Sequence, residues 1–357
     1  MSLRAVALFG ADLYRDRSII RGLGAELDSQ SWSYHDSTLP LPEKVLLDRI
    51  RRKALARAGV VAGIGDDSAV LRVPAGHEVL VTTDFSLEGV HFRREWHSPD
   101  VVGHRCLTRG LSDIAAMGGA PVAAFVSIAL PPELLQSWVD GFYEGLLNLA
   151  KTFSVTLAGG DTAESSNGVM ADIVVLGSVP RGKAVLRSGA RPGDRIFVTG
   201  SLGGSAAALN LLLSGKRKKL RPGDFPAHFF PTPRIEVGRV LRERSLASAM
   251  IDISDGLSTD LTHICEESGV GAEIEAAAIP YGNIGKPSQK VDLRYALHGG
   301  DDYELLFTSH PAKRIPAIIN GVPITQIGQI IKRKRIFLRK PDGKQEPLNA
   351  RGWEHFK

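Results

Sequence analysis

The first half of the chain alternates segments in which apolar residues recur every second position with segments in which they recur every third or fourth. The first pattern is typical of strands and the second of helices. It predicts strands at 78–84, 120–130, 155–161 and 169–180, and helices at 101–118 and 132–153. An earlier helix is expected to begin at Pro42, where PEKVLLDRIRRKALARAG has apolar residues at helical spacing. Residues 1–41 lack any sustained period and are expected to form a poorly ordered extension.

The second half resumes the same alternation after RSGARPGD at 187–194, a segment of turn residues without apolar periodicity. Strands are predicted at 195–200, 249–254, 303–309 and 324–340, and helices at 206–213, 232–243 and 256–269. A chain of 357 residues also favours more than one domain. The expected fold class is therefore α+β, with two mixed α/β-layer domains at 42–186 and 187–357.

Composition narrows the class of protein. Apolar residues make up 43% of the chain and charged residues 23%, and no apolar run is long enough to span a bilayer, so an integral membrane protein is not expected. RAVALFGADL near the N-terminus is too short and too interrupted by charge for a secretory signal. Cys106 and Cys265 lie inside helical patterns and indicate no disulfide framework. A cytoplasmic location is expected.

The net charge of +5 comes largely from two basic runs, KRKKLR from Lys216 and KRKR from Lys332. Neither contains the interleaved aromatic residues that accompany basic residues in many nucleic-acid interfaces. We interpret both runs as solvated loops and expect no nucleic-acid partner. A basic rim of this kind also attracts phosphorylated ligands.

Carboxylates recur at the ends of the predicted elements, often beside glycine. The segments are GIGDD (63–67), TTD (82–84), SD (112–113), GGD (159–161), DISD (252–255) and GGDD (299–302). Two carboxylates about 4 Å apart repel by roughly 4 kcal/mol at an effective dielectric constant near 20, so such pairs need a proton, a cation or a metal. Any one segment is also compatible with an ordinary turn. Asp113 is harder to dismiss because its helix is otherwise apolar, with Arg109 as the competing salt-bridge partner.

Taken together, the acids indicate a site for Mg²⁺ and a polyphosphate. Hard oxygen ligands without clustered His or Cys suit Mg²⁺, and adjacent glycines let backbone N–H groups approach phosphate oxygens. Motifs of P-loop proteins, dinucleotide-binding proteins and protein kinases are absent from the sequence. The segment TGSLGGSAA (199–207) either cradles phosphate at a helix N-terminus or forms a tight strand-to-helix turn, and we favour the turn.

The order and spacing of these segments resemble thiamine-monophosphate kinases. The motifs are GIGDDSAVL, TTDFSLEGVHF, LSDIAAMGG, AGGDT, VLRSGARPGD, IDISDGL and GGDDYELLF, and the likeness covers roughly residues 43 to 357. This superfamily includes aminoimidazole ribonucleotide synthetase and selenophosphate synthetase. The resemblance implies transfer of the γ-phosphoryl group of ATP to thiamine monophosphate with several Mg²⁺ ions. It also implies a homodimer in which the N-terminal sheets of the two subunits meet.

The resemblance assigns roles to individual residues. The implied metal ligands are Asp67, Thr82, Thr83, Asp84, Asp113, Asp161, Asp252 and Asp255, of which Asp67, Asp84, Asp113 and Asp161 are the predicted catalytic acids. The implied nucleotide contacts are Gly160, Asp161, Arg187 and Ser254, and the implied substrate contacts are His91, Asp301 and Trp353. Asp301 stands where the family commonly has glutamate.

Alternatives remain open at this point. Arg187 is as well explained by an ion pair in the boundary loop, His91 by a structural role, and Trp353 by anchoring of the C-terminal tail. Another ATP-dependent synthetase of the same superfamily would use similar acids, although a selenophosphate synthetase should carry a reactive cysteine near its N-terminus. A non-catalytic nucleotide- or metal-binding module is the alternative from a different class.

Overall fold

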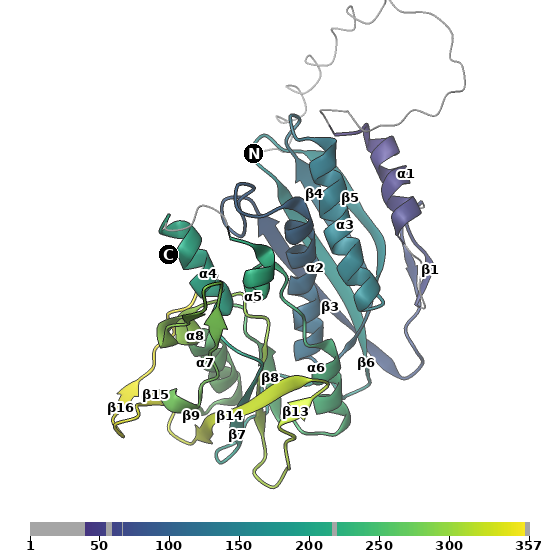
Figure 1. Cartoon of the computed structure of the whole chain (residues 1–357). Helices are drawn as coiled ribbons and strands as arrows, with labels where there is room; N and C mark the ends of the chain where they lie inside the picture. Colours follow the sequence, from purple (N-terminus) through teal and green to yellow (C-terminus); the bar gives the residue numbers. More distant parts are fainter. Residues whose placement is uncertain (1–39, 55–58, 66, 216–219, 354–357) are drawn as a thin grey trace, which may run out of the picture. The chain divides into compact units, whose positions relative to one another are not determined.

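The computed structural model describes residues 40–54, 59–65, 67–215 and 220–353 (Figure 1). The expected N-terminal extension, Asp66 and the start of the basic run at Lys216 lie outside the described residues, except for 40 and 41 at the end of the extension. The second basic run, from Lys332, is largely exposed between two strands, as predicted for a solvated loop.

A four-stranded sheet forms the first half of the described chain. Its order is β3 (His77–Leu87), β6 (Met170–Pro180), β4 (Ala120–Leu130) and β5 (Thr156–Glu164). All pairs are antiparallel except β4 with β5, which are parallel and connected through helix α3. The four strands and two helices predicted in this region are confirmed. Helices α2 (Pro99–Ala116) and α3 (Gln136–Thr152) lie side by side on one face of the sheet (Figure 1).

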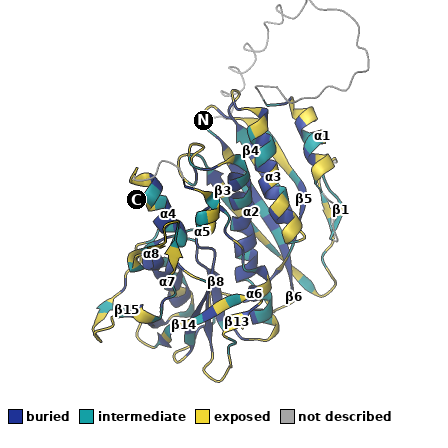
Figure 2. Cartoon of the chain, viewed as in Figure 1, coloured by how far each residue is buried: buried dark blue, intermediate teal, exposed yellow. Residues whose placement is uncertain are grey.

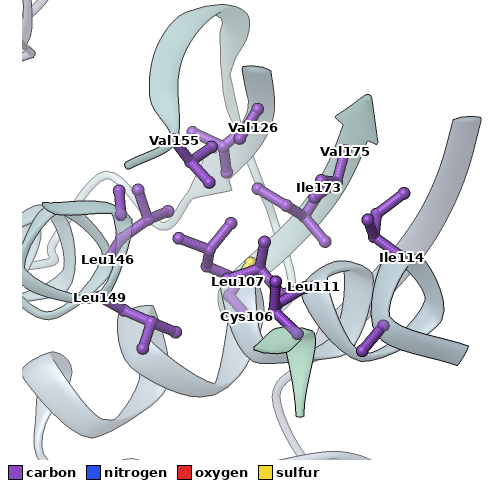
Figure 3. Close-up of a cluster of buried hydrophobic side chains, with 14 of the residues drawn as sticks. Cys106, Leu107, Leu111, Ile114, Val126, Leu146, Leu149, Val155, Ile173 and Val175 are labelled. Carbon is purple, nitrogen blue, oxygen red and sulfur yellow. The ribbon is translucent and has the colours of Figure 1, made fainter. Parts of the chain in front are cut away.

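The alternation of apolar residues decides which face of the sheet the helices cover. Ile173 and Val175 of β6 point to the helices and are fully buried, and Figure 3 shows them directed toward Leu107 and Leu111 of α2. Most of α2 is buried (Figure 2). On β3 the opposite face is open: Val79, Val81 and Phe85 are 48%, 66% and 60% exposed. The sheet therefore has one packed face and one apolar face that the described residues leave uncovered.

Two glycines allow the backbones of α2 and α3 to touch. A Cβ atom on Gly103 of α2 would lie 1.8 Å from the carbonyl oxygen of Phe142, and one on Gly145 of α3 would lie 1.9 Å from that of Asp100. Both distances are far below van der Waals contact, so any larger residue would force the helices apart. Close helix packing at this point fixes the position of α2.

An eight-stranded mixed sheet forms the second half. Its order is β16-β15-β9-β14-β7-β12-β8, with β13 paired to β14. The strands are β7 (Arg195–Thr199), β8 (Ala249–Asp252), β9 (Gly271–Glu275), β12 (Leu305–Ser309), β13 (Ile318–Ile319), β14 (Val322–Ile331), β15 (Ile336–Arg339) and β16 (Gln345–Pro347). Only β9 and β15 run parallel among the pairs of this sheet. The predicted strand at 324–340 is interrupted because the charged run 332–335 turns the chain between β14 and β15.

The remaining elements connect and cover these sheets. The helices are α1 (Glu43–Lys53), α4 (Gly204–Leu213), α5 (Pro226–Phe229), α6 (Ile235–Glu243), α7 (Leu257–Ser268) and α8 (Leu293–His298). Two short 3₁₀ turns are η1 (Pro222–Asp224) and η2 (Ala276–Ala278). The short strands are β1 (Val60–Ala62), β2 (Val70–Leu71), β10 (Asn283–Ile284) and β11 (Gln289–Lys290).

The apolar core continues from the first sheet to the second. Phe197 of β7 and Phe307 of β12 stack with ring centroids 5.2 Å apart and belong to the same buried cluster as Leu107 and Leu111 of α2. A second cluster lies around α7 and includes Leu257 and Leu261. Helix α2 therefore contacts both halves of the described chain and can bring side chains of both halves close together.

Two sequence expectations concern the wider environment of the chain. Cys106 and Cys265 are both buried in helices and form no disulfide, as predicted. Among the described residues, no helix combines the length and the apolar character needed to cross a membrane.

The glycine contact yields a stability prediction. Gly145→Ala is expected to lower the free energy of unfolding by about 3 kcal/mol, because overpacking against a backbone oxygen outweighs the gain of about 1 kcal/mol in helix propensity. Urea unfolding followed by circular dichroism measures the difference. Gly223→Ala is the control, since a Cβ atom there meets nothing within 4 Å. Equal stability of the two variants would contradict the close packing of α2 and α3.

Candidate functional site

A hollow of about 720 Å³ brings together most of the predicted site residues, and we call it the acid hollow. Its predicted members are Thr83, Asp84, His91, Asp113, Asp252, Ser254, Asp255, Asp301 and Trp353. They come from the edge strand β3 and the turn after it, from α2, from the end of β8 and the turn that follows, from the segment before β12, and from the C-terminal segment. Residues more than 200 positions apart in sequence thus line one cavity, as the repeated acids predicted.

Burial raises the pKa values of three acids in the hollow, and for two of them nearby carboxylates add to the shift. Burial, together with the nearby charge of Asp113, raises the pKa of Asp84 to about 6. Burial and the same neighbour raise the pKa of Asp252 to about 7, against an ordinary value of 3.8. Burial also raises the pKa of Asp113, although Thr82, Arg187 and Arg109 oppose the shift. A metal ion near these carboxylates would replace the proton that each otherwise tends to keep.

Hydroxyl groups orient two of these acids. Thr82 Oγ1 donates a hydrogen bond to Asp113 Oδ2, and Ser112 Oγ donates one to Asp252 Oδ2 at 2.6 Å. Ser112 and Asp113 are neighbours on α2, so one turn of this helix reaches both β3 and β8. The competing explanation, a salt bridge between Arg109 and Asp113, is not what the described residues form: Arg109 pairs with Asp301 instead, at 3.5 Å.

Asp301 is held from several sides. Its Oδ2 accepts a hydrogen bond from Arg105 Nη2 at 2.8 Å, and its Oδ1 accepts one from the Tyr303 hydroxyl at 2.6 Å. The backbone here is strained, since Asp301 has φ 64° and Tyr303 has φ 52°, a region that favours glycine. Backbone N–H groups of both residues donate to carbonyls at 253 and 254, which holds this conformation. Strain of this kind often accompanies functional sites.

Asp67, Gly160 and Asp161 lie in a second hollow of about 720 Å³, between α1 and the edge strand β5, which we call the β5 hollow. The sheet order places β6 and β4 between β3 and β5. Three strand spacings separate Asp84 from Asp161, or about 14 Å. Within one chain the structure therefore does not gather all the predicted metal ligands into one site.

Thr82 and Arg187 line a third hollow of about 500 Å³ that shares Asp113 and Asp252 with the acid hollow. Arg187 lowers the pKa of both acids, although burial has the larger, opposite effect on each. The described residues show no ion pair of Arg187 with an acid, so the alternative of a boundary-loop salt bridge gains no support.

The glycine-rich segment 199–207 leads into α4, and a carboxylate occupies the start of that helix. Asp302 Oδ2 accepts a hydrogen bond from the backbone N–H of Gly203 at 2.7 Å, and burial raises the pKa of Asp302 well above its ordinary value. A phosphate would have to compete with this side chain. The structure thus favours a tight turn over a phosphate cradle at this helix.

His91 and Trp353 both line the acid hollow. The backbone N–H of Leu87 donates to His91 Nδ1 at 3.0 Å, so in the neutral ring the proton is on Nε2. The indole of Trp353 is exposed, while its backbone N–H donates to the carbonyl of Asp255 at 3.2 Å. The assignment of these two residues to the substrate stays a prediction.

Sequence reasoning missed several polar residues of the wall. Ser205 of α4 lines the acid hollow, and its Oγ lies 3.0 Å from His228 Nδ1. His228 Nε2 in turn lies 3.1 Å from His97 Nε2. Burial lowers the pKa of His97 to about 4 and that of His228 well below its ordinary value, so both rings are neutral near pH 7. No motif links these positions, and only the fold brings them together.

A further acidic group lies beside the acid hollow. Asp255, Asp260 and His263 offer ligand atoms that all lie within 4.8 Å of one another. Asp260 and His263 are one turn apart on α7, which is the sequence signal that was missed. Asp260 already accepts hydrogen bonds from the backbone N–H groups of Asp255 and Gly256, so part of its role is to hold this turn.

The raised pKa of Asp252 makes a prediction for metal-free protein. A carboxyl group whose pKa is higher in the folded state stabilises the fold at low pH, and this contribution is lost as the pH rises from about 4 to about 7. Asp252→Asn should therefore gain thermal stability relative to wild type as the pH is raised from 5 to 8. Melting temperatures in a chelating buffer test this. Asp342→Asn, at an exposed position, is the control, and an equal difference at every pH for Asp252→Asn would contradict the prediction.

Comparison with known proteins identifies the family. Residues 65–179 match AIR synthase related protein, N-terminal domain, and residues 191–340 match AIR synthase related protein, C-terminal domain. Thiamine-monophosphate kinase of Bacillus subtilis is 36% identical over 325 residues, which cover 87% of this chain and 98% of the relative.

Solved structures agree with the sequence relatives. A crystal structure of thiamine-monophosphate kinase from Stenotrophomonas maltophilia is 35% identical, has a TM-score of 0.74 and covers 85% of this chain and 98% of its own. A structure described as AaThiL complexed with AMPPCP and TMP is 33% identical, has a TM-score of 0.69 and covers 88% of this chain and 97% of its own. With identity above 30% over nearly the full length of these relatives, the chain belongs to the thiamine-monophosphate kinase family.

Proposed function

We propose that this chain transfers the γ-phosphoryl group of ATP to thiamine monophosphate, giving thiamine diphosphate and ADP. The observation that carries the proposal is the acid hollow, where several acids of raised pKa share one cavity with residues matched to the substrate. Membership of the family supports it. So does the related structure described as a complex with AMPPCP and TMP, since AMPPCP is an ATP analogue.

The acceptor makes a direct transfer chemically reasonable. The phosphate of thiamine monophosphate is itself the nucleophile, so the protein needs no general base to generate one. An oxygen of this phosphate attacks the γ-phosphorus of ATP while the bond to the β-phosphate oxygen breaks, and ADP leaves. The obstacle is repulsion between two anions, which positioning and fixed positive charges overcome.

The donor set of the hollow fits Mg²⁺. It consists of carboxylate and hydroxyl oxygens. Burial and neighbouring carboxylates raise the pKa values of Asp84 and Asp252, and a bound cation would favour the ionised form of both acids. The proposed ligands are those the resemblance implied. Thr83, Asp84, Asp113, Asp252 and Asp255 line the acid hollow, Thr82 lines the third hollow beside it, and Asp67 and Asp161 lie in the β5 hollow. When bound, Mg²⁺ neutralises phosphate oxygens and acts as a Lewis acid. The chain's own contribution is to orient these oxygens, for example through the hydrogen bond of Ser112 to Asp252.

We also propose that the enzyme is a homodimer whose N-terminal sheets meet. The open face of β3 exposes Val81 and Phe85, an apolar surface that a second copy would cover. Asp84 lies on one edge strand and Asp161 on the other. If two copies pack face to face about a two-fold axis that runs along the strands, the β5 edge of one subunit lies near the β3 edge of its partner. Asp161 then completes the metal site of the other subunit, which explains the separation within one chain.

In this proposal the first domain covers residues 42–186 and the second covers residues 187–357, beginning with the boundary segment 187–194. The segment that joins the two family matches, from 180 to 190, lies beside it. Arg187 in this segment lines the hollow that shares Asp113 and Asp252 with the acid hollow, which fits its proposed contact with the nucleotide.

The function is tested by measuring thiamine diphosphate formation from ATP with thiamine monophosphate or unphosphorylated thiamine as acceptor. Only thiamine monophosphate should give product, and a chelator should abolish the reaction. Asp113→Asn should reduce kcat by about 100-fold or more, because it removes charge at the centre of the hollow. Asp342→Asn is the control and should keep wild-type activity. Absence of thiamine diphosphate with the wild-type protein would refute the proposal.

The shared site is tested by combining two inactive variants. Asp84→Asn and Asp161→Asn are co-expressed with different tags, and the species carrying both tags is purified. If each site takes Asp84 from one subunit and Asp161 from the other, this heterodimer has one intact site and about half of the wild-type activity. Each variant alone should be inactive as a homodimer. A heterodimer as inactive as both parents would show that the two acids must belong to the same chain.

A further inference from the structure

Arg109 is a cation in the wall of the acid hollow that the sequence indicated only as a partner of Asp113. It lies on α2 one turn before Asp113, and its side chain is 12% exposed. Its Nε is buried and has no hydrogen-bond partner among the described residues. A buried guanidinium nitrogen without a partner needs an explanation, and the planar donors of arginine form strong hydrogen bonds with phosphate.

Asp301 fixes the direction of this guanidinium. Asp301 Oδ1 faces Arg109 Nη2 at 3.5 Å and accepts the Tyr303 hydroxyl, and Oδ2 accepts Arg105 Nη2. Burial would raise the pKa of Asp301, but Arg105, Arg109 and Tyr303 outweigh this effect and hold the pKa below its ordinary value. Both oxygens of the carboxylate thus already have donors from the protein.

Only one of the two arginines beside Asp301 is among the residues that line the acid hollow. Two guanidiniums face the single carboxylate of Asp301. Arg105 is only 4% exposed and donates its other end to the carbonyl of His228, so it belongs to the interior. The two imidazoles nearby, His97 and His228, are neutral. Of the two guanidiniums, Arg109 is therefore the one that lines the acid hollow, where its charge also acts on Asp84 and Asp113.

Arg109 also stands between the two groups of residues that the proposed reaction uses. One turn further along its helix is Asp113, in the acid group, and its ion-pair partner Asp301 lies in the group matched to the acceptor. A molecule of thiamine monophosphate has a cationic ring system and a phosphate. The ring system is repelled by an arginine, whereas the phosphate is bound by its planar donors.

We propose that Arg109 binds the phosphate of the acceptor, and that Asp301 is a positioning residue that acts through Arg109. This inference rests on the proposed function and names the group that recognises the acceptor's phosphate. It gives Asp301 a role that does not require its carboxylate to touch the substrate. The shorter side chain at 301, where the family commonly has glutamate, then serves to seat an arginine.

The experiment compares Arg109→Gln with wild type at saturating Mg²⁺ and ATP. The KM for thiamine monophosphate should rise by about 10- to 100-fold, since hydrogen bonds to charged groups contribute that much to binding. The inhibition constant of unphosphorylated thiamine should stay within about twofold, because thiamine lacks the group that Arg109 binds. The KM for ATP should change little. Arg109→Lys keeps the charge without the planar donors, so its KM for thiamine monophosphate should lie between those of wild type and Arg109→Gln.

Asp301→Asn tests the positioning role. It should raise the KM for thiamine monophosphate by less than Arg109→Gln does. The KM of the double variant should not exceed that of Arg109→Gln alone. Arg239→Gln removes the same charge from an exposed site on α6 and is the control. Melting curves confirm that each variant is folded.

Three outcomes overturn the inference. The first is an unchanged KM for thiamine monophosphate in Arg109→Gln or, if that variant does not fold, in Arg109→Lys. The second is an equal rise in the KM for thiamine monophosphate and in the inhibition constant of thiamine, which indicates a merely structural residue. The third is full additivity of the Arg109 and Asp301 substitutions. Wild-type turnover is measured first: a wild-type enzyme that fails to phosphorylate thiamine monophosphate refutes the proposed function, whereas an active wild type with any of these outcomes refutes only the role of Arg109.

Discussion

The burial of charged side chains on helix α2 is the constraint on which the rest of the structure depends. This helix lies in the apolar core, yet it carries Arg105, Arg109 and Asp113. A buried charge must be paired, and the partners come from elsewhere in the chain: Asp301 for the two arginines and Thr82 for Asp113. The ion pairs with Asp301 join the two halves of the described chain where their apolar surfaces also meet. Asp113 and Asp301, which take part in the polar contacts of this helix, also line the acid hollow.

The same constraint explains why the helix backbone is packed so closely. Gly103 and Gly145 bring α2 against α3, so the turns that carry Arg109 and Asp113 have a fixed height above the sheet. Functional groups placed on a rigid element keep their geometry better than groups on loops. The acid at the end of β8, and the acid in the strained segment from Asp301 to Tyr303, then contact side chains of this fixed helix.

Much of the fold was predictable because a clear apolar period indicates both the type of element and the face that it buries. The strand at 120–130 has the predicted bounds, and α2 differs from its predicted range by two residues at each end. Strand β9, with the sequence GAEIE, was missed because five residues with glycine and alanine give no clear period. The repeated acids predicted that Asp84, Asp113, Asp252, Asp255 and Asp301 share one hollow, but not that Ser205 lines it as well. The placement of Asp161 three strands away was not predictable, because strand order depends on contacts between distant segments. Arg109 appeared in the sequence only as a possible partner of Asp113, since its pairing with Asp301 spans 192 positions.

The line of side chains from His97 through His228 to Ser205 has a consequence for the chemistry of the cavity wall. Each neutral imidazole carries a single N–H, and one of the two facing Nε2 atoms must be the donor. If His97 donates, His228 has its proton on Nδ1 and Ser205 must accept, so the serine hydrogen is free to point at a bound molecule. If His228 donates, Ser205 gives its hydrogen to Nδ1 and offers only lone pairs. The tautomeric state of a histidine pair outside the cavity thus determines whether Ser205 offers a ligand a hydrogen-bond donor or only an acceptor.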